Sequence, residues 1–272
     1  MKTAASSNHE RSGSLPSVTA GAVRLCRWLL PTLVIMAQAQ DFSYSTDHGT
    51  ITITGYTGLG GIVTIPGAIN GLPVTSIRAN AFKGRGSFTS VVIPSSVTNI
   101  GYAPFIGCTN LSEITVDVLN AFYRSVDGVL FDKSQTTLIQ YPVARTGSFT
   151  IPDGVRTIGK QAFYGSLGLT RLAMPDSVRV IEDGAFANCI GLNEATIGKG
   201  VVVMRAQAFM NCGRLKGAYF RGDAPTLGSA VFDGDSYATA YYSRGTTGWE
   251  LGHDEGFAGL RTVLAHTENR WF

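Results

Sequence analysis

The sequence predicts a mainly β solenoid, because several features recur along it at one spacing. Phenylalanines follow one another at 23 residues, with a single longer interval of 58 residues between Phe105 and Phe163. An apolar residue stands five positions before each of them. A fixed period of roughly 20–29 residues is typical of leucine-rich solenoids, whose repeats bury their apolar side only by stacking. We expect the phenylalanines to form an interior ladder: Phe82, Phe105, Phe163, Phe186, Phe209 and Phe232.

Each copy is expected to contain two short parallel strands, joined by turns or single helical turns. One strand ends just before a proline, as in Thr89–Ile93, and the second runs through the V-x-x-I pattern, as in Val97–Ile100. Proline cannot donate a ladder hydrogen bond, so Pro94 belongs between the two strands.

The repeat is most regular over 169–214, where LTRLAMPDSVRVIEDGAFANCIG is followed by LNEATIGKGVVVMRAQAFMNCGR. This pattern resembles the BspA-like leucine-rich repeat family of bacterial surface and secreted proteins. The resemblance covers roughly residues 62–234. It implies a curved right-handed solenoid with a parallel sheet on one face and a role in adhesion or protein recognition. The family offers no catalytic residues to carry over.

Four segments are expected. Residues 1–39 hold a leader and a signal peptide, residues 40–61 an N-terminal cap hairpin, residues 62–234 the solenoid, and residues 235–272 a C-terminal cap and tail. The signal peptide is predicted from a charged stretch, a short apolar run and an A-x-A site ending at Ala39. The apolar run is too short to span a bilayer. We therefore expect export, to the medium or the cell surface, with no membrane span after cleavage; the alternative is an uncleaved anchor.

Composition and charge exclude a nucleic-acid partner. The 272 residues are 44% hydrophobic and 15% charged, and they include 33 glycines, which suits a chain of many tight turns. The formal charge of +3 arises within residues 1–39, and the remainder carries 18 basic and 18 acidic side chains. Phosphate binders need a basic patch or stripe, which a near-neutral body without a basic run lacks.

The irregular interval contains a predicted insertion at about 118–140. Two strand-like segments flank Asp132-Lys133-Ser134-Gln135, which indicates a hairpin with a four-residue turn. We expect this hairpin to project from the solenoid, where insertions are often used in binding. The alternative is that it only accommodates a change in curvature.

Outward strand positions form the candidate binding surface. Its Thr and Ser content favours hydrogen bonding without strong charge, and three of its arginines are candidates for a basic stripe facing an acidic partner. The alternative for that stripe is a solvated face of mixed charge. The residues are Thr89, Ser90, Val92, Arg156, Thr170, Arg171, Ala173, Arg179, Asn193, Glu194, Thr196 and Tyr219.

No catalytic, cofactor or metal site is predicted. The few histidines lie in the leader, a cap turn and the tail, and no motif of a hydrolase, nucleotide binder or metalloprotease occurs.

Cys108, Cys189 and Cys212 share one repeat column, which predicts buried thiols; a Cys189–Cys212 disulfide and a metal site are the alternatives. Asp233-Gly234-Asp235 is a weak calcium-loop pattern, and Asp117, Asp127 and Asp132 are interpreted as turn residues.

These observations favour a non-enzymatic solenoid that binds a protein or a cell-surface glycan. The alternative is a structural module of a cell-envelope assembly without a specific ligand. A hydrolase of surface polymers is the remote third hypothesis.

Overall fold

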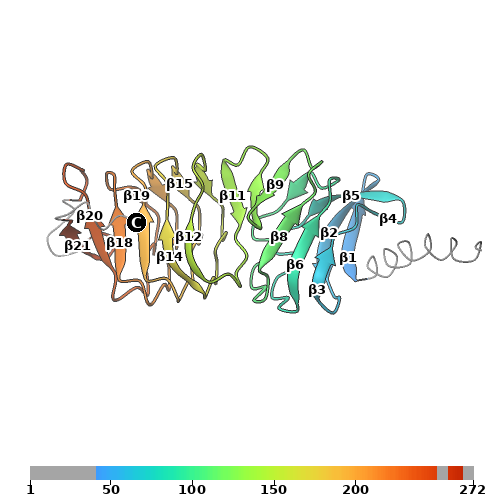
Figure 1. Cartoon of the computed structure of the whole chain (residues 1–272), viewed down its shortest axis with the longest axis horizontal. Helices are drawn as coiled ribbons and strands as arrows, with labels where there is room; N and C mark the ends of the chain where they lie inside the picture. The colour runs from blue at the N-terminus through green and yellow to red at the C-terminus, as the bar shows by residue number, and fades with distance from the viewer. Residues whose placement is uncertain (1–40, 250–256, 266–272) are drawn as a thin grey trace, which may run out of the picture. The chain divides into compact units, whose positions relative to one another are not determined.

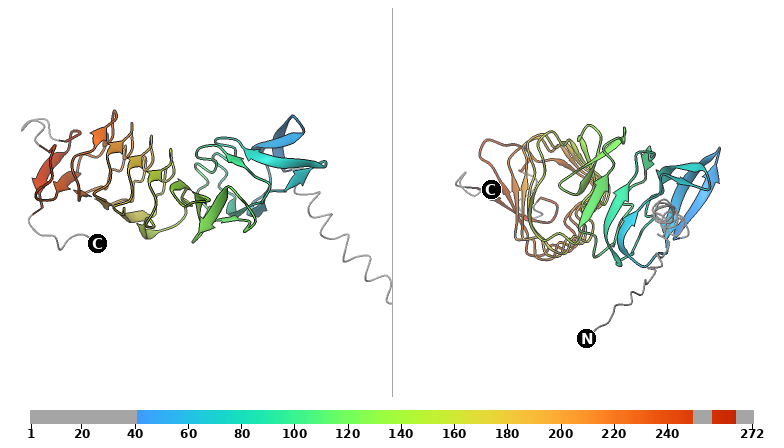
Figure 2. Two further views of the ribbon diagram at one scale, coloured as in Figure 1. Left: turned by 90° about the horizontal axis from the view of Figure 1, so that it is seen from above. Right: turned by 45° about the vertical axis from the view of Figure 1, so that its right-hand side comes forward.

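The computed structural model describes residues 41–249 and 257–265, which coil as a β solenoid (Figure 1). Within these residues the chain forms strands and turns and contains no helix. Successive turns of the chain lie side by side along the solenoid (Figure 2). The mainly β solenoid with a 23-residue period is thus confirmed, with turns in place of the optional helical turns.

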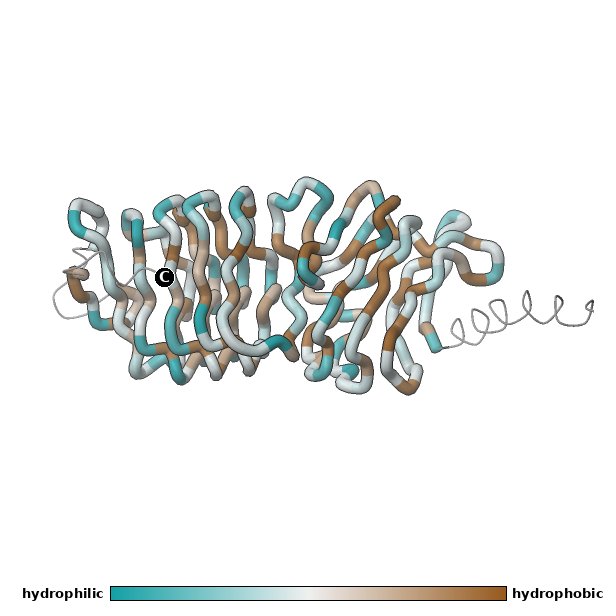
Figure 3. The backbone as a smooth tube through the Cα atoms, viewed as in Figure 1, coloured by the Kyte–Doolittle hydropathy of each residue, from teal (hydrophilic) through white to brown (hydrophobic). Residues whose placement is uncertain are grey.

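Each regular repeat contributes a longer strand to one sheet and a two-residue strand to another. In the repeat with Pro94 these are β6 (Phe88–Ile93) and β7 (Asn99–Ile100). The short strand arises because only two residues of the V-x-x-I pattern pair before the chain turns around the phenylalanine. Hydrophobic segments recur at similar levels in successive turns, and hydrophilic segments gather at many of the connecting turns (Figure 3).

Two sheets build the N-terminal part of the solenoid. In the first, the hairpin β1–β2 adds to the repeats through a parallel pairing of β2 with β5. Its strands are β1 (Phe42–Asp47), β2 (Thr50–Tyr56), β4 (Ala68–Ile69), β5 (Leu72–Ile77) and β7. The second sheet has the order β3 (Gly61–Thr64), β6, β8 (Glu113–Val116). Asn70 and Gly71 turn β4 into β5 with φ of 51° and 80°, as a two-residue hairpin turn requires.

Two longer sheets build the C-terminal part. The seven-stranded sheet has the order β19 (Thr226–Leu227), β17 (Val203–Met204), β15 (Val180–Ile181), β13 (Thr157–Ile158), β11 (Thr137–Gln140), β10 (Val129–Asp132), β9 (Tyr123–Val126). The six-stranded sheet has the order β12 (Gly147–Thr150), β14 (Leu169–Ala173), β16 (Glu194–Ile197), β18 (Gly217–Phe220), β20 (Thr239–Tyr242), β21 (Arg261–Leu264).

Strands β20 and β21 lie in the segment expected to form the C-terminal cap and tail. Both continue the six-stranded sheet in parallel register, β18 with β20 and β20 with β21. The predicted leader and signal peptide of residues 1–39 lie outside the described residues, as do 250–256 and 266–272. Among the residues described, no helix has the length and apolarity needed to cross a bilayer.

The predicted insertion does not project from the solenoid. Strands β9, β10 and β11 form an antiparallel meander, and β11 then pairs in parallel with β13 of the next repeat. The additional strand β9 turns into β10 through Asp127 and Gly128, both with positive φ. The predicted hairpin around Asp132–Gln135 is present as β10 and β11, but the expectation that it projects is wrong, because the meander forms one end of the seven-stranded sheet.

Strand β10 separates two apolar cores. Leu130 packs into the N-terminal core with Phe82 and Phe105. Its neighbours Val129 and Phe131 pack into the C-terminal core, because successive side chains of a strand point to opposite faces. Deleting the insertion would therefore open both cores, which makes the deletion unsuitable as a test of binding.

The phenylalanine ladder is interior. All six predicted members are buried, and the rings of Phe163, Phe186 and Phe209 are stacked with centroids 4.7 and 4.8 Å apart. The ladder also has a member that the sequence did not reveal. Tyr141 stacks on Phe163 at 4.6 Å and fills the ring position in the repeat that lacks a phenylalanine.

Asn120 is the polar exception in the wall of the solenoid. It stands 23 residues after the buried Val97 and is fully buried itself. Its Nδ2 donates to the carbonyl oxygens of Pro94 and Val97 at 2.9 Å. Its Oδ1 accepts from the amides of Phe122 and Tyr123 at 2.9 and 2.8 Å. One side chain therefore ties the insertion to the preceding repeat.

Candidate recognition surface

Outward side chains of the six-stranded sheet form two parallel rows. Alternate residues of each strand point inward, where small side chains such as Ala195, Ala218 and Ala240 are fully buried. Strand register then aligns the outward residues across rungs. The first row is Ser148, Arg171, Glu194, Gly217, Thr239 and Arg261, and the second is Thr150, Ala173, Thr196, Tyr219, Tyr241 and Val263.

Two tyrosines stand at the centre of this face. The rings of Tyr219 and Tyr241 are nearly parallel, at 13°, with centroids 4.9 Å apart. The Tyr219 ring lies over Gly217, where a Cβ atom would come within 2.7 Å of it. Glycine at this position therefore allows the ring to lie along its own strand, with the two phenol groups on neighbouring rungs.

A charge pair lies beside the tyrosines in the first row. Arg171 Nε is 3.2 Å from Glu194 Oε2, across the β14–β16 pair. Opposite charges on directly paired residues stabilise a sheet modestly. The face therefore presents an ion pair next to two aromatic rings rather than an isolated cation.

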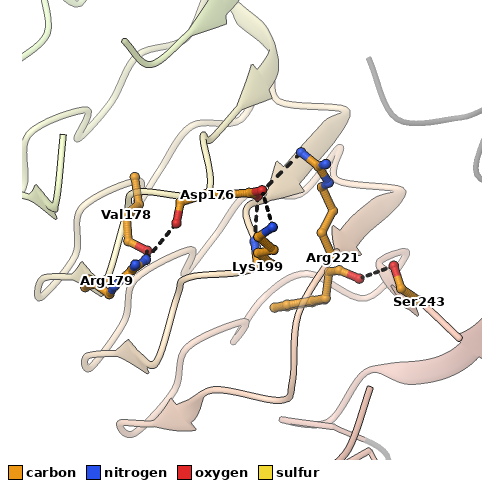
Figure 4. Close-up of polar contacts among 7 residues, drawn as sticks. Asp176, Val178, Arg179, Lys199, Arg221 and Ser243 are labelled. Atoms are coloured by element: carbon orange, nitrogen blue, oxygen red, sulfur yellow. Dashed lines mark hydrogen bonds and ion pairs between the residues drawn. The ribbon is translucent and has the colours of Figure 1, made fainter. Parts of the chain in front are cut away.

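Asp176 holds together the turns at one border of the face (Figure 4). Its carboxylate accepts from the Lys199 amide at 3.0 Å and lies 3.3 Å from Lys199 Nζ and 3.5 Å from Arg221 Nη1. Partial burial alone would raise the pKa of Asp176, but these bonds and charges lower it below its usual range. The turns after β14, β16 and β18 are thereby linked by one carboxylate.

The predicted surface residues do not share one continuous sheet. Thr89, Ser90 and Val92 lie in β6 of the three-stranded sheet, whereas most of the others lie in or next to the six-stranded sheet. That second group is Thr170, Arg171, Ala173, Asn193, Glu194, Thr196 and Tyr219. Thr196 was expected to be exposed but is only 6% exposed, because it lies in the row between Ala173 and Tyr219.

The candidate arginine stripe does not form. Arg171 lies in β14, whereas Arg156 and Arg179 precede β13 and β15 of the other long sheet. Arg179 Nη1 donates to the carbonyl oxygens of Asp176 and Val178 at 2.7 and 3.2 Å. The three arginines therefore belong to two different faces, and two of them make local contacts.

Sequence reasoning missed Gly217 and Tyr241, which complete the face. Tyr241 stands 22 residues after Tyr219, one short of the period, and lies in a segment read as a cap. The aromatic residue near the expected position in the next repeat was the available signal. The missing residue falls in the loops between β18 and β20, so the strands themselves stay in register.

The cysteines form an interior column of free thiols. Cys108, Cys189 and Cys212 are buried, and each Sγ donates to a phenylalanine carbonyl of the preceding repeat at 3.0–3.2 Å. Burial raises the pKa of Cys108 to about 12, which keeps that thiol protonated. Cys189 and Cys212 are therefore free thiols in the structure, and the alternative of a disulfide between them is not observed.

The carboxylates of the insertion serve its turns. Asp132 accepts from Ser134 Oγ, Thr136 Oγ1 and the Thr137 amide at 2.6–2.8 Å. Asp117 Oδ1 accepts from the Leu119 amide at 2.8 Å. No group of three or more His, Cys, Asp or Glu side chains suited to a metal ion occurs in the described part of the chain.

Asp235 occupies the position of the cysteines in the last repeat of the column. It is 3% exposed, and neither carboxylate oxygen has a hydrogen-bond partner among the described residues. Burial raises the pKa of Asp235 to about 7, with a smaller contribution from the negative charge of Asp233. A neutral carboxyl group resembles a thiol in having one proton to donate, so the protonated form suits this column.

Asp235 should make the solenoid less stable as the pH rises. The pKa of Asp235 is about 7 in the folded chain and about 3.9 in an unfolded one. Its stabilising contribution is therefore complete below pH ~4 and lost as the pH rises to ~7. We expect the free energy of unfolding of Asp235→Asn, measured in urea, to equal that of the natural chain near pH 4. At pH 8 it should be about 2 kcal/mol higher than that of the natural chain.

Asp235→Cys, which restores the thiol of the column, is the matched control for the asparagine variant and should behave in the same way. A constant difference in the free energy of unfolding between variant and natural chain across this pH range would show that folding does not raise the pKa of Asp235.

A family model described as the BspA type leucine rich repeat region matches residues 75–144 and 143–247 in six copies. No curated protein sequence matches the chain. Three solved structures share the fold at TM-scores of 0.57, 0.53 and 0.53, all at 20% identity or less.

The first is a leucine-rich repeat protein from Eubacterium ventriosum, 20% identical over 81% of this chain and 81% of that chain. The second is a leucine rich cell surface protein from Faecalibacterium prausnitzii, 20% identical over 85% of this chain and 95% of that one. The third is the pneumococcal vaccine antigen PcpA, 16% identical over 82% and 84% of the two chains. At these identities the likeness shows the fold alone.

Proposed function

The chain belongs to the BspA-type leucine-rich repeat family, and from this premise we propose that it is a non-catalytic protein that binds another protein through the six-stranded sheet. Members of this repeat family are generally binding modules. The observation that carries the proposal is the pair Tyr219 and Tyr241 beside the Arg171–Glu194 ion pair. Tyrosine and arginine are enriched among the residues that dominate protein–protein binding energies.

We further propose that the protein acts outside the cell, secreted or at the cell surface. The support is the predicted signal peptide together with the fold shared with a leucine rich cell surface protein. A polar sheet face with small residues around two rigid rings suits such contacts, since tyrosine supplies contact area at a low entropic cost.

The loop between β8 and β9 is the second candidate surface. Val118 and Leu119 are 88% and 79% exposed, although both are apolar. The loop follows the Asp117 turn and is anchored by the buried Asn120. Exposed apolar side chains on a well-anchored loop favour it as an alternative site of binding.

Binding assays with point variants distinguish the two surfaces. The purified chain is tested by pull-down against extracellular-matrix proteins and envelope polysaccharides, and the affinity for any captured ligand is then measured. We expect the double variant Tyr219→Ala, Tyr241→Ala to bind a protein ligand about thirty-fold more weakly, as loss of roughly 2 kcal/mol at a dominant contact implies. Tyr237→Ala, which removes one tyrosine ring from an exposed position outside the rows, is the control for the loss of a surface ring.

The other outcomes assign the function differently. Loss of binding in Val118→Ser, Leu119→Ser with retention in the tyrosine variant would move recognition to the loop. Binding only to polysaccharides would replace the protein ligand by a glycan. No binding to any partner would favour the structural module of an envelope assembly.

A further inference from the structure

The six-stranded sheet has an open edge in the interior of the solenoid. Strand β12 pairs with β14 on one side, and the sheet ends with it. The preceding strand on the same side of the solenoid, β8, ends a different sheet (Figure 1). Strands β14, β16, β18 and β20 each have a neighbour on both sides, so β12 stands where the row of rungs is interrupted.

The open edge presents backbone groups without partners among the described residues. The amides of Gly147 and Ile151 donate to Gly168 and Ala173 on the β14 side, at 2.8 and 2.9 Å. Because a strand alternates the direction of its backbone groups, the N–H and C=O groups of Ser148 and Thr150 point away from β14. Both residues are exposed.

The facing strand β8 cannot close this edge, because its own groups are bonded elsewhere. The Ile114 amide donates to the carbonyl oxygen of Gly128 at 2.9 Å, and the Val116 amide donates to Ser125 Oγ at 3.1 Å. The β9–β10 hairpin therefore completes β8 and leaves β12 unpaired. Unpaired edges are ready templates for another strand.

Side chains at the edge indicate what such a strand would carry. Phe149 packs on the rings of Tyr141 and Phe163 but remains only half-buried. The equivalent inward residues of the next rungs, Leu172 and Ala195, are buried because each has a rung on both sides. A strand added to β12 would complete the burial of Phe149 if it placed an apolar side chain inward. Small polar residues would suit its alternate, outward positions beside Ser148 and Thr150.

From this geometry we propose that the edge of β12 binds an extended peptide segment of a partner protein by strand addition. Main-chain hydrogen bonds to Ser148 and Thr150 supply the affinity, and the apolar contact with Phe149 supplies the preference for an alternating polar and apolar sequence. This edge lies in the same sheet as the tyrosines, three rungs from Tyr219, and its binding does not require the tyrosine rings.

The test uses the purified chain and a synthetic peptide with the sequence of residues 146–152, TGSFTIP, which has the required alternation. Amide hydrogen exchange is followed by nuclear magnetic resonance. We expect saturating peptide to slow exchange of the Ser148 and Thr150 amides at least tenfold and to leave the Phe149 amide, which faces β14, unchanged. Ser148→Pro removes one edge donor and should abolish the effect, whereas Ser148→Ala should retain it.

A second pair of peptides tests the mechanism on the natural chain, without relying on the proline variant. The two peptides are N-methylated on opposite alternate residues, so one has lost the amides that face β12 and the other has not. We expect the first to have no effect on exchange and the second to bind like the parent. Equal behaviour of the two peptides, or no change in exchange at millimolar peptide, would falsify strand addition. Protection of Ser148 that rises with protein concentration alone would instead assign the edge to a second copy of the chain.

Discussion

Phe186→Ala should lower the free energy of unfolding by about 3–5 kcal/mol, measured by urea denaturation. Phe186 is fully buried, and its ring stacks between Phe163 and Phe209. Removing the ring leaves a cavity in the middle of a column whose backbone spacing is set by the sheets on either side, so the neighbours cannot close in. The loss of stability therefore combines the transfer free energy of the buried ring and the cost of the cavity that it leaves.

Phe122→Ala is the matched control, because it removes the same ring from a half-exposed position. We expect it to cost less than about 1 kcal/mol. A cost below about 1 kcal/mol for Phe186→Ala itself would show that the phenylalanine column is not interior.

Asn120→Ala should destabilise the chain by on the order of 3 kcal/mol. The substitution removes two donated and two accepted hydrogen bonds at a fully buried position. It removes the Asn120 donor from the carbonyls of Pro94 and Val97; the Pro94 carbonyl keeps the bond from the Val97 amide. A buried polar group left without a partner costs about 1–3 kcal/mol. Urea denaturation measures the change in the free energy of unfolding. The rate of hydrogen exchange should increase most at the Phe122 and Tyr123 amides, which lose their acceptor.

Asn110→Ala provides the comparison for this variant. Asn110 is exposed, and its Nδ2 makes a single bond to the Gly86 carbonyl at 2.6 Å. We expect that change to stay within about 0.5 kcal/mol. If the two asparagine variants cost the same, Asn120 is not the tie between the insertion and the repeats.

The regular repeats could be predicted because one spacing controls several side-chain columns at once. Phe186 and Cys189 recur in phase, so their burial follows from the period alone. Each phenylalanine of the ladder also has one residue at positive φ two positions before it and another two positions after it, such as Gly184 and Asn188 around Phe186. The sequence did not predict those turns. In other repeats the position two residues before the phenylalanine is Gln161 or Ala103, and glutamine and alanine rarely adopt positive φ.

The insertion and the binding face depend on contacts that the period does not describe. Asn120 stands in a column of valines, and only its hydrogen bonds to two segments explain a polar residue there. Tyr141 replaces phenylalanine in the ladder at a spacing of 22 residues from Phe163. Thr196 looks exposed from its outward position, but its burial depends on the side chains in the neighbouring rungs.

The placement of β10 between two cores has a consequence for how the repeats share stability. In a stacked array each repeat is stabilised chiefly by its nearest neighbours, so cooperativity passes along the chain one interface at a time. Between β8 and β12 that transmission is carried by side chains on the two faces of β10 rather than by a continuous backbone ladder. The molecule therefore has two apolar blocks with one shared wall. We expect a defect in either block to reach the other chiefly through Val129, Leu130 and Phe131, assisted by the bonds of Asn120 and by the Ala144 amide, which donates to the carbonyl oxygen of Leu111.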